Sequence, residues 1–305
     1  MDLPNFAYFK GEIIPYSQAK VGVMTHGLNY GTAAFGGIRA YWNSERKKLY
    51  MFRPLDHFRR FLNSTRLLCM DLRQTPESLL EITHELLRKE NYARDIYIRP
   101  LAYKADETIG VKLHDLQDEL TIFAVPFDRY VSNDTDAHVT ISSWRRVDDN
   151  VIPARGKISG AYVNSAMAKT DAQLSGFDEA LVLNQDGHIS EGSAENVFIL
   201  RNNTLYTPPV TDNILEGITR PTVIEMAQNE LGIATQERPI DRTELYLCDE
   251  LFLTGTAVQI TAVTQVDHRL IGNGKMGPVT AQLRQLYADV VRACLPKYAA
   301  WNFEV

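Results

Sequence analysis

The sequence has few cysteines, no excess of basic residues and no long apolar run, and each absence excludes a class of protein. Three cysteines in 305 residues, Cys69, Cys248 and Cys294, stand far apart among apolar residues, so we expect buried free thiols and no disulfide framework. A net charge of −6, from 32 basic and 38 acidic residues, disfavours nucleic acid and anionic membranes as partners. No apolar run approaches the roughly eighteen residues of a membrane helix, and the N-terminus lacks a secretory signal pattern, which predicts a cytoplasmic protein.

The seven histidines do not form a metal-binding pattern either. His84 and Glu85 resemble the start of a zinc-protease helix, but Arg88 stands where the second histidine is required. We therefore expect no metal. A content of 45% hydrophobic and 23% charged residues is typical of a soluble globular protein, and the length suffices for about two domains.

Strand and helix patterns mix without regular alternation, which predicts a mixed α+β fold and not a doubly wound parallel sheet. We expect an N-terminal α/β domain over residues 1–124, a linker over 125–137 where periodicity is lost, and a C-terminal domain over 138–305. The expected helices lie at 56–70, 77–88, 159–174 and 278–295, and a further helix begins near 216. The expected strands lie at 95–101 and 139–144, with a strand-like segment at 250–266. Hairpins are expected at 6–23, 179–191 and 196–208.

The strand at 95–101 alternates in polarity. Ile96 and Ile98 lie on one face, and Tyr97 and Arg99 lie on the other. Two interpretations stand side by side: an edge strand with one solvated face, or a phenol and a guanidinium on one wall of a pocket.

Lys157 stands between Gly156 and Gly160, in a segment of small residues that would let the backbone or a flat ligand approach closely. A lysine becomes a Schiff-base nucleophile when burial or nearby positive charge lowers its pKa, and Arg155 is near enough in sequence to supply that charge. Most lysines in such turns are simply solvated, so this feature alone does not establish chemistry.

Two further segments have the composition of phosphate sites. Residues 217–220 place glycine and threonine at the start of a helix, and Gly255-Thr256 follows a strand. Ordinary helix caps have the same composition. Residues 272–277 match the dinucleotide fingerprint formally, but too little chain follows for the second half of a nucleotide-binding sheet.

In combination, the glycine-flanked lysine, the glutamate turn at 190–196, the helix start and the Gly-Thr turn resemble the fold-type IV, class IV aminotransferases that use pyridoxal phosphate. The chain is most similar to the branched-chain amino acid aminotransferases. The resemblance implies pyridoxal 5′-phosphate as cofactor, a small N-terminal domain, a larger C-terminal domain with a pseudo-barrel of strands and flanking helices, and a homodimer or higher oligomer. It extends from about residue 11 to 287 and is carried by residues 29–32, 35–39, 57–61, 97–101, 157–160, 190–196, 217–220 and 255–257.

The resemblance also implies roles for individual residues. Lys157 would be catalytic, holding the cofactor as a Schiff base and moving the proton at the substrate Cα, and Glu191 would pair with the pyridine nitrogen. The other implied cofactor-binding residues are Arg60, Ile218, Thr219 and Thr256 at the phosphate and Tyr162 at the phenolic oxygen. The implied substrate-binding residues are Tyr30, Phe35, Arg39, Tyr97, Arg99 and Tyr130, with the amides of Thr256 and Ala257 at the α-carboxylate.

The implied reaction moves the amino group of leucine, isoleucine or valine to 2-oxoglutarate, giving glutamate and branched-chain 2-oxo acids. The sequence departs from the family pattern at Gly36, Phe127 and Ala194, which bears on substrate preference, and Gly36 leaves room for activity on primary amines. The alternatives are a D-amino acid or (R)-amine transaminase or a lyase on the same fold, and a non-catalytic protein whose glycine turns bind a phosphorylated metabolite.

Overall fold

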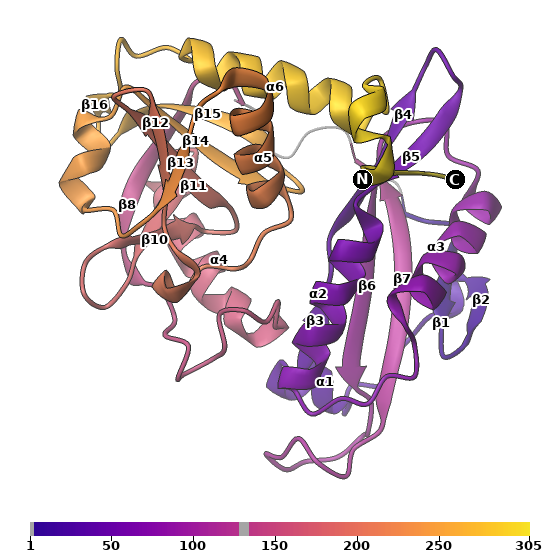
Figure 1. Ribbon diagram of the computed structural model, residues 1–305. Coiled ribbons are helices and arrows are strands. Elements are labelled where there is room, and N and C mark those ends of the chain that lie inside the picture. The colour runs from indigo at the N-terminus through magenta and orange to yellow at the C-terminus, as the bar shows by residue number, and fades with distance from the viewer. Residues whose placement is uncertain (1–2, 128–133) are drawn as a thin grey trace. The chain divides into compact units, whose positions relative to one another are not determined.

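The computed structural model describes residues 3–127 and 134–305 (Figure 1). The chain forms two compact units, neither of which is continuous in sequence. Unit 1 comprises residues 1–128, 156–161 and 289–305, and unit 2 comprises residues 129–155 and 162–288. The middle of the predicted linker lies outside the described residues. No helix of the described chain is both long enough and apolar enough to span a bilayer.

Unit 1 is built on an eight-stranded sheet in the order β17-β5-β4-β6-β7-β1-β2, with β3 paired to β6. All its described pairs are antiparallel, and the first of them, β1 with β2, confirms the predicted N-terminal hairpin. Its strands are β1 Phe6–Phe9, β2 Glu12–Pro15, β3 Ala33–Phe35, β4 Ile38–Asn43, β5 Lys48–Phe52, β6 Ile96–Lys104, β7 Asp118–Pro126 and β17 Asn302–Glu304.

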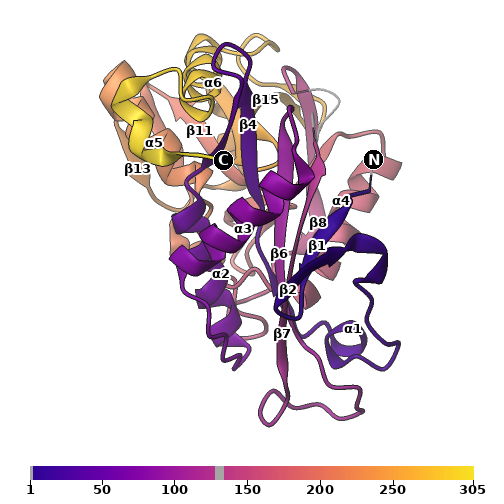
Figure 2. The same ribbon diagram turned by 90° about the vertical axis from the view of Figure 1, so that its right-hand side faces the viewer.

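Two helices cover one face of this sheet (Figure 2). Helix α2, Pro54–Leu67, has proline in its first turn, where the missing N–H is not needed. Helix α3, Pro76–Glu90, begins with a capping box in which Thr75 and Ser78 exchange hydrogen bonds. Their apolar faces are buried, as the two helical periodicities predict. The shorter helices of this unit are α1 His26–Tyr30, η1 Tyr16–Gln18, η2 Ser159–Ala161 and η5 Pro296–Trp301.

Strand β6 lies inside the sheet and not at its edge, since β4 and β7 pair with its two sides. Ile96 and Ile98 are fully buried, whereas Tyr97 and Arg99 are half-buried on the opposite face. The predicted alternation is therefore confirmed, and the edge-strand interpretation is wrong.

Unit 2 contains a nine-stranded mixed sheet in the order β10-β9-β8-β15-β14-β11-β12-β13, with β16 paired to β15. Strand β8 runs parallel to β9 and β15, and β12 runs parallel to β13; the other described pairs are antiparallel. Its strands are β8 Ala137–Arg145, β9 Glu179–Leu183, β10 Ile189–Gly192, β11 Asn196–Arg201, β12 Thr204–Thr207, β13 Thr235–Glu237, β14 Glu250–Gly255, β15 Gln259–Val266 and β16 Arg269–Leu270.

The core of unit 2 is formed by inward-facing residues of these strands, among them Val139, Leu181, Val197 and Leu251. The hairpins β9–β10 and β11–β12 confirm the two that the turn residues predict. Its helices are α4 Tyr162–Leu174, η3 Val210–Asp212, α5 Thr219–Leu231 and η4 Arg242–Leu247, and α6 Pro278–Val291 has its last residues in the segment assigned to unit 1.

Three predicted elements differ from the structure. The helix expected at 159–174 is a 3-10 turn, η2, followed by α4, and the backbone N–H of Gly160 in η2 donates to the carbonyl of Gly31. The strand-like segment at 250–266 is a hairpin, β14 and β15, closed by Gly255 opposite Gln259. The last helix ends at Val291, before the predicted residue 295.

The expectation that all three thiols are buried is wrong for two of them. Cys69 and Cys294 are exposed, since each lies just beyond the end of a helix, and Cys69 has a left-handed backbone with φ 51°. Cys248 is buried, and its burial raises the pKa of the thiol to about 12. All three cysteines are free.

Candidate functional site

The backbone of Lys157 is fastened to unit 1 on two sides. Its N–H donates to Oγ of Ser64 at 3.0 Å, and its carbonyl accepts the N–H of Phe35 at 2.9 Å. Ser64 is fully buried on α2 and donates in turn to the carbonyl of Arg60 at 2.9 Å. Lys157 and Arg60, two predicted cofactor-binding residues, are thus connected through one serine.

The glycines near Lys157 lie in close packing within the protein. A Cβ on Gly156 would lie 2.8 Å from Cδ1 of Leu67. A Cβ on Gly31 would lie 2.9 Å from Cα of Gly160, and Gly31 also has a left-handed φ of 66°. These glycines let two backbone segments approach each other, which is one of the two functions that the sequence suggests for them.

Three predicted substrate-binding residues gather beside Lys157. The Phe35 ring has Nζ of Lys157 at 5.0 Å and the guanidinium of Arg99 at 4.4 Å from its centroid. Arg99 donates from Nη2 to the hydroxyl of Tyr97 at 2.9 Å. Next to them, a Cβ on Gly37 would lie 2.3 Å from the same hydroxyl, so a larger residue there would displace the Tyr97 side chain. The cluster combines an amine, a guanidinium and two aromatic rings.

The other predicted substrate residues lie elsewhere. Tyr30 belongs to α1, and its hydroxyl accepts the N–H of Gly110 at 3.2 Å. Arg39 is 1% exposed, pairs with Asp95 at 3.6 Å and donates to the carbonyl of Phe127 at 2.7 Å. Tyr130 lies outside the described residues.

His57 lies one turn before Arg60 on α2. It is buried, and that burial, followed by the positive charges of Arg60 and Lys157, lowers its pKa well below the ordinary value. His57 is therefore neutral at physiological pH. Arg60, Lys157 and Arg53 all place positive charge near His57, so this part of unit 1 suits an anion, and the Lys157 amine suits an aldehyde.

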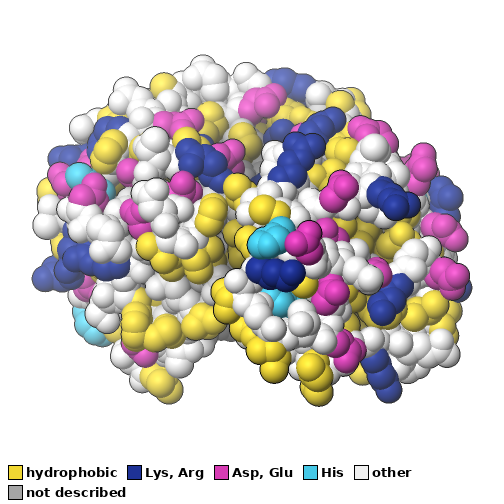
Figure 3. Space-filling view, turned by 90° about the horizontal axis from the view of Figure 1, so that it is seen from below, with side chains coloured by type: hydrophobic (Ala, Val, Ile, Leu, Met, Phe, Trp, Pro, Cys, Tyr) yellow, Lys and Arg dark blue, Asp and Glu magenta, His cyan; other side chains and the backbone are white. Residues whose placement is uncertain are grey.

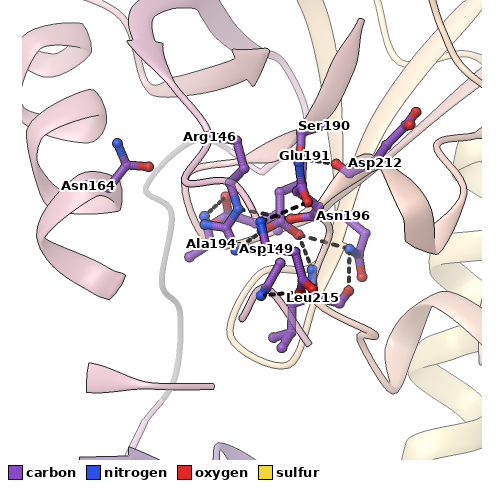
Figure 4. A network of polar contacts seen from close by, with 12 residues as sticks. Arg146, Asp149, Asn164, Ser190, Glu191, Ala194, Asn196, Asp212 and Leu215 are labelled. Atoms are coloured by element: carbon purple, nitrogen blue, oxygen red, sulfur yellow. Dashed lines mark hydrogen bonds and ion pairs between the residues drawn. The ribbon is translucent and has the colours of Figure 1, made fainter. Parts of the chain in front are cut away.

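In unit 2, a network of polar contacts surrounds the carboxylate of Glu191 on β10 (Figure 4). Oε1 lies 2.9 Å from Nη2 of Arg146. Oε2 accepts hydrogen bonds from Nδ2 of Asn196 at 3.2 Å and from the N–H of Leu215 at 3.0 Å. Glu191 is buried, so these contacts supply the compensation that a buried carboxylate needs.

A second buried acid, Glu195, lies between β10 and β11. It is 3% exposed, and its Oε2 accepts the N–H of Ala194 at 3.0 Å. Burial, and then the negative charge of Glu179, raises the pKa of the Glu195 carboxyl to about 8. Glu179 itself is paired with Lys169. At neutral pH Glu195 therefore carries a proton.

The start of α5 lies beside Asn196. A Cβ on Gly217 would lie 2.2 Å from Oδ1 of Asn196, so a larger residue would require the Asn196 side chain to shift. Ile218 precedes the helix, and no side chain caps its first turn. Asn196 also pairs across the sheet with Thr254. The helix start and the segment leading to the β14–β15 turn are thus both next to Asn196.

The remaining predicted residues of unit 2 lie in a turn and at the start of a helix. Thr256 and Ala257 form the turn between β14 and β15, and Tyr162 is the first residue of α4; all three are half-buried. Arg155 pairs with Glu216 at 3.2 Å and Asp149 at 3.7 Å, so two carboxylates compensate the charge that the sequence suggested for activating Lys157.

The sequence interpretation missed Ser64, Arg146 and Asn196. Ser64 follows Arg60 by one helical turn, which is a readable signal. Asn196 lies at the end of the glutamate turn that carries the resemblance. Arg146 has no local signal, since it reaches Glu191 only through the pairing of β8, β9 and β10.

Each unit, taken by itself, holds residues that suit a part of pyridoxal phosphate. A buried, oriented carboxylate such as Glu191 can accept a hydrogen bond from a protonated ring nitrogen. A helix start without a side-chain cap suits a phosphate, as does an arginine such as Arg60. A lysine amine condenses with an aldehyde.

Comparisons with known proteins give a consistent result. A family model described as amino-transferase class IV matches residues 34–266. The chain is 48% identical over 297 residues to a probable branched-chain-amino-acid aminotransferase of Aquifex aeolicus, covering 97% of this chain and 96% of the relative. The structure of a branched-chain aminotransferase from Thermoproteus uzoniensis with norvaline matches with a TM-score of 0.94 and 40% identity, over 99% of both chains. The T.th. branched-chain amino acid aminotransferase complexed with N-(5′-phosphopyridoxyl)-L-glutamate matches with a TM-score of 0.93 and 39% identity, over 98% of both chains.

Proposed function

Because the chain belongs to the class IV aminotransferases, and among them to the branched-chain-amino-acid aminotransferases, we propose that it transfers the amino group of leucine, isoleucine or valine to 2-oxoglutarate. The products are glutamate and the branched-chain 2-oxo acids, and pyridoxal phosphate is the cofactor. The fold is that of the fold-type IV enzymes. The structural observation that carries the proposal is the buried Glu191 carboxylate, oriented by Arg146, Asn196 and Leu215.

When bound, pyridoxal phosphate supplies an aldehyde for the amino group and a ring that withdraws electrons from the substrate Cα. Lys157 would hold the cofactor through its aldehyde, and its Nζ would carry the proton at the substrate Cα. The Glu191 carboxylate would accept a hydrogen bond from the ring nitrogen. Arg60, the amides of Ile218 and Thr219, and Thr256 would bind the phosphate, and Tyr162 would bond the phenolic oxygen.

The two substrates differ in their side chains, one apolar and one acidic. Phe35 and Tyr97 offer apolar ring surface, and Arg99 offers a guanidinium for the distal carboxylate of 2-oxoglutarate. Tyr30, Tyr130, which lies outside the described residues, and the amides of Thr256 and Ala257 at the α-carboxylate belong to the proposal because the resemblance implies them. Arg39 forms an ion pair with Asp95 and donates a hydrogen bond to the carbonyl of Phe127, so its role in the pocket wall is to position Phe127. Norvaline and a glutamate adduct in the two matched structures agree with this pair of substrate types.

A homodimer is part of the proposal. In unit 1, the His26 ring of α1 is hydrogen-bonded at 2.8 Å to the Gly110 carbonyl, in the loop before β7. Figure 3 views this side of the molecule, where apolar side chains gather. Groups of exposed apolar side chains usually mark protein contacts, and a second copy of the chain is the partner that an enzyme of this family offers. The exposed apolar residues here are Val21, Val23, Met24, Leu28, Tyr30, Ile109 and Val111, which we name the α1 patch.

We also propose a cytoplasmic location. The three cysteines are free, and two of them are exposed, which suits a reducing compartment.

No observation favours the alternative of a D-amino acid or (R)-amine transaminase. Gly36 was the residue that left room for it, but a Cβ there would lie 2.6 Å from Cγ of Pro100. Glycine at this position is explained by packing against β6.

The test is to measure initial rates with 2-oxoglutarate and leucine, D-alanine or (R)-1-phenylethylamine. We expect turnover of leucine, a visible absorption band that borohydride bleaches, and loss of both in Lys157→Ala. The control is Lys20→Ala, a change at an exposed lysine. No turnover of leucine, isoleucine or valine would refute the substrate assignment, and a colourless protein with an unaffected Lys157→Ala variant would support the non-catalytic alternative.

A further inference from the structure

Arg146 directly follows β8 and is anchored by three separate contacts. Its backbone N–H donates to the carbonyl of Leu183 at 2.8 Å, its Nε donates to the carbonyl of Asn213 at 3.0 Å, and its Nη2 lies 2.9 Å from Oε1 of Glu191. The side chain is 11% exposed, against 3% for that of Glu191. The guanidinium is therefore held in place and lies against a carboxylate with little access to water.

Asn213, which receives Nε of Arg146, is itself fixed. It has a left-handed backbone with φ 56°, its Nδ2 donates to Oδ1 of Asn184 at 3.1 Å, and its Oδ1 accepts the N–H of Asp149 at 3.2 Å. The guanidinium therefore joins a rigid carbonyl to the Glu191 carboxylate through two different nitrogens (Figure 4). A lysine could supply the charge but could not make both contacts in this geometry.

The environment of Glu191 makes this guanidinium important for the charge of the carboxylate. Two further donors, Nδ2 of Asn196 and the N–H of Leu215, are neutral and both bind Oε2. A buried carboxylate without a cationic partner tends to take up a proton and become neutral. If Glu191 did so, it could no longer stabilise a proton on a ring nitrogen.

We propose that Arg146 is a positioning residue that keeps Glu191 charged and oriented, so that the proton between Glu191 and the cofactor ring stays on the ring nitrogen. This inference rests on the proposed function. Arg146 has no role in the sequence-based assignment. In this proposal it controls how strongly the cofactor ring withdraws electrons.

The experiment compares Arg146→Gln and Arg146→Lys with wild type, each loaded with pyridoxal phosphate that carries 15N in the ring. The nitrogen chemical shift reports the ring proton directly, and the rate of the half-reaction at saturating leucine reports its effect. We expect wild type and Arg146→Lys to keep the proton, and Arg146→Gln to lose it with a rate at least about 100-fold lower. Arg145→Gln is the matched control. Arg145 is exposed, and its side chain donates to the carbonyl of Asn184 at 3.2 Å and not to Glu191. We expect the rate of this variant to stay within about twofold of wild type.

A double-variant cycle separates this role from a general effect on folding. If Arg146 acts through the charge of Glu191, Arg146→Gln should change the rate by less than about threefold in a Glu191→Gln background. In cofactor-free protein, Arg146→Gln should lower the thermal midpoint, and Glu191→Gln should restore it. This second measurement needs no bound cofactor and remains informative if Arg146→Gln loads poorly.

Two results would overturn the inference: a ring nitrogen that stays protonated in Arg146→Gln, or a rate loss that is as large in the Glu191→Gln background as in wild type. A wild-type protein that binds no pyridoxal phosphate or does not turn over leucine would instead refute the proposed function. The two failures are therefore distinguishable.

Discussion

Arg99 donates a hydrogen bond of 2.9 Å to the hydroxyl of Tyr97, two residues earlier on the same face of β6. The guanidinium also lies against the Phe35 ring, at 4.4 Å from its centroid. One strand face therefore presents an aromatic surface and a cation together. Such a wall can accept an apolar side chain and, with little rearrangement, a carboxylate.

We predict that Arg99→Met separates the two half-reactions. The KM for 2-oxoglutarate should rise by about 10- to 100-fold, because the distal carboxylate loses a charge-assisted hydrogen bond. The half-reaction with leucine should stay within about threefold of wild type, since the apolar surface is kept. Stopped-flow measurement of each half-reaction checks this. The variant Tyr97→Phe, which keeps the guanidinium and removes only its partner hydroxyl, should have an intermediate effect on 2-oxoglutarate; equal losses on both substrates in Arg99→Met would contradict the assignment.

Ser64 should matter for activity beyond its effect on stability. Its Oγ joins the N–H of Lys157 to the carbonyl of Arg60. Ser64→Ala should lower the free energy of unfolding by about 1 to 2 kcal/mol, because a buried N–H loses its acceptor. It should also reduce kcat severalfold, because the backbone of Lys157 is no longer fastened to α2.

Thr83 provides the control for Ser64. It is also fully buried, and its hydroxyl donates within α3 to the carbonyl of Leu79 at 2.7 Å. Thr83→Val should affect stability and leave kcat unchanged, as measured by urea unfolding and steady-state rates on the same samples. If both variants reduced kcat equally, Ser64 would be a core residue without a specific link to Lys157.

Glu195 should make stability depend on pH. Its pKa in the folded protein, about 8, lies above the ordinary value of 4.5, so the folded state binds the proton more tightly. The stabilisation is complete below the unfolded pKa and is lost as the pH rises towards 8. Glu195→Gln imitates the protonated form, so it should match wild type below about pH 4.5 and exceed it by on the order of 5 kcal/mol at pH 9.

Urea unfolding of wild type and Glu195→Gln at several pH values measures this difference. Glu225→Gln, at an exposed position on α5, should follow wild type throughout. If Glu195→Gln showed the same pH dependence as wild type, Glu195 would be ionised in the folded protein and the buried acids would need another explanation.

The α1 patch should control oligomeric state. Val23 and Ile109 are each 84% exposed, and changing both to aspartate would introduce charge into an apolar contact. We predict a dimer for wild type and a monomer for Val23→Asp/Ile109→Asp in sedimentation equilibrium. Leu247→Asp, an exposed apolar position on η4 of unit 2, should leave the dimer intact. A wild-type protein that sediments as a monomer would disprove this part of the proposal.

Local sequence patterns determined much of this protein. The polarity alternation of residues 95–101, the turn residues of the hairpins and the apolar periodicity of the helices act between near neighbours. They therefore predict β6, the β9–β10 and β11–β12 hairpins and the helices within a few residues. The order of motifs around Lys157 and Glu191 was enough to indicate the family, because each motif is a short run of neighbouring residues that contact the same ligand.

Only the tertiary structure decided which residues support those motifs. Arg146 reaches Glu191 because β9 pairs with both β8 and β10, and Ser64 reaches Lys157 because α2 packs against β3. The inner position of β6, the exposure of Cys69 and the grouping of residues 156–161 and 289–305 with the N-terminal segments were decided in the same way. Strand pairing and helix packing join residues far apart in the chain. Apart from the one-turn spacing between Arg60 and Ser64, the sequence carries no local trace of those contacts.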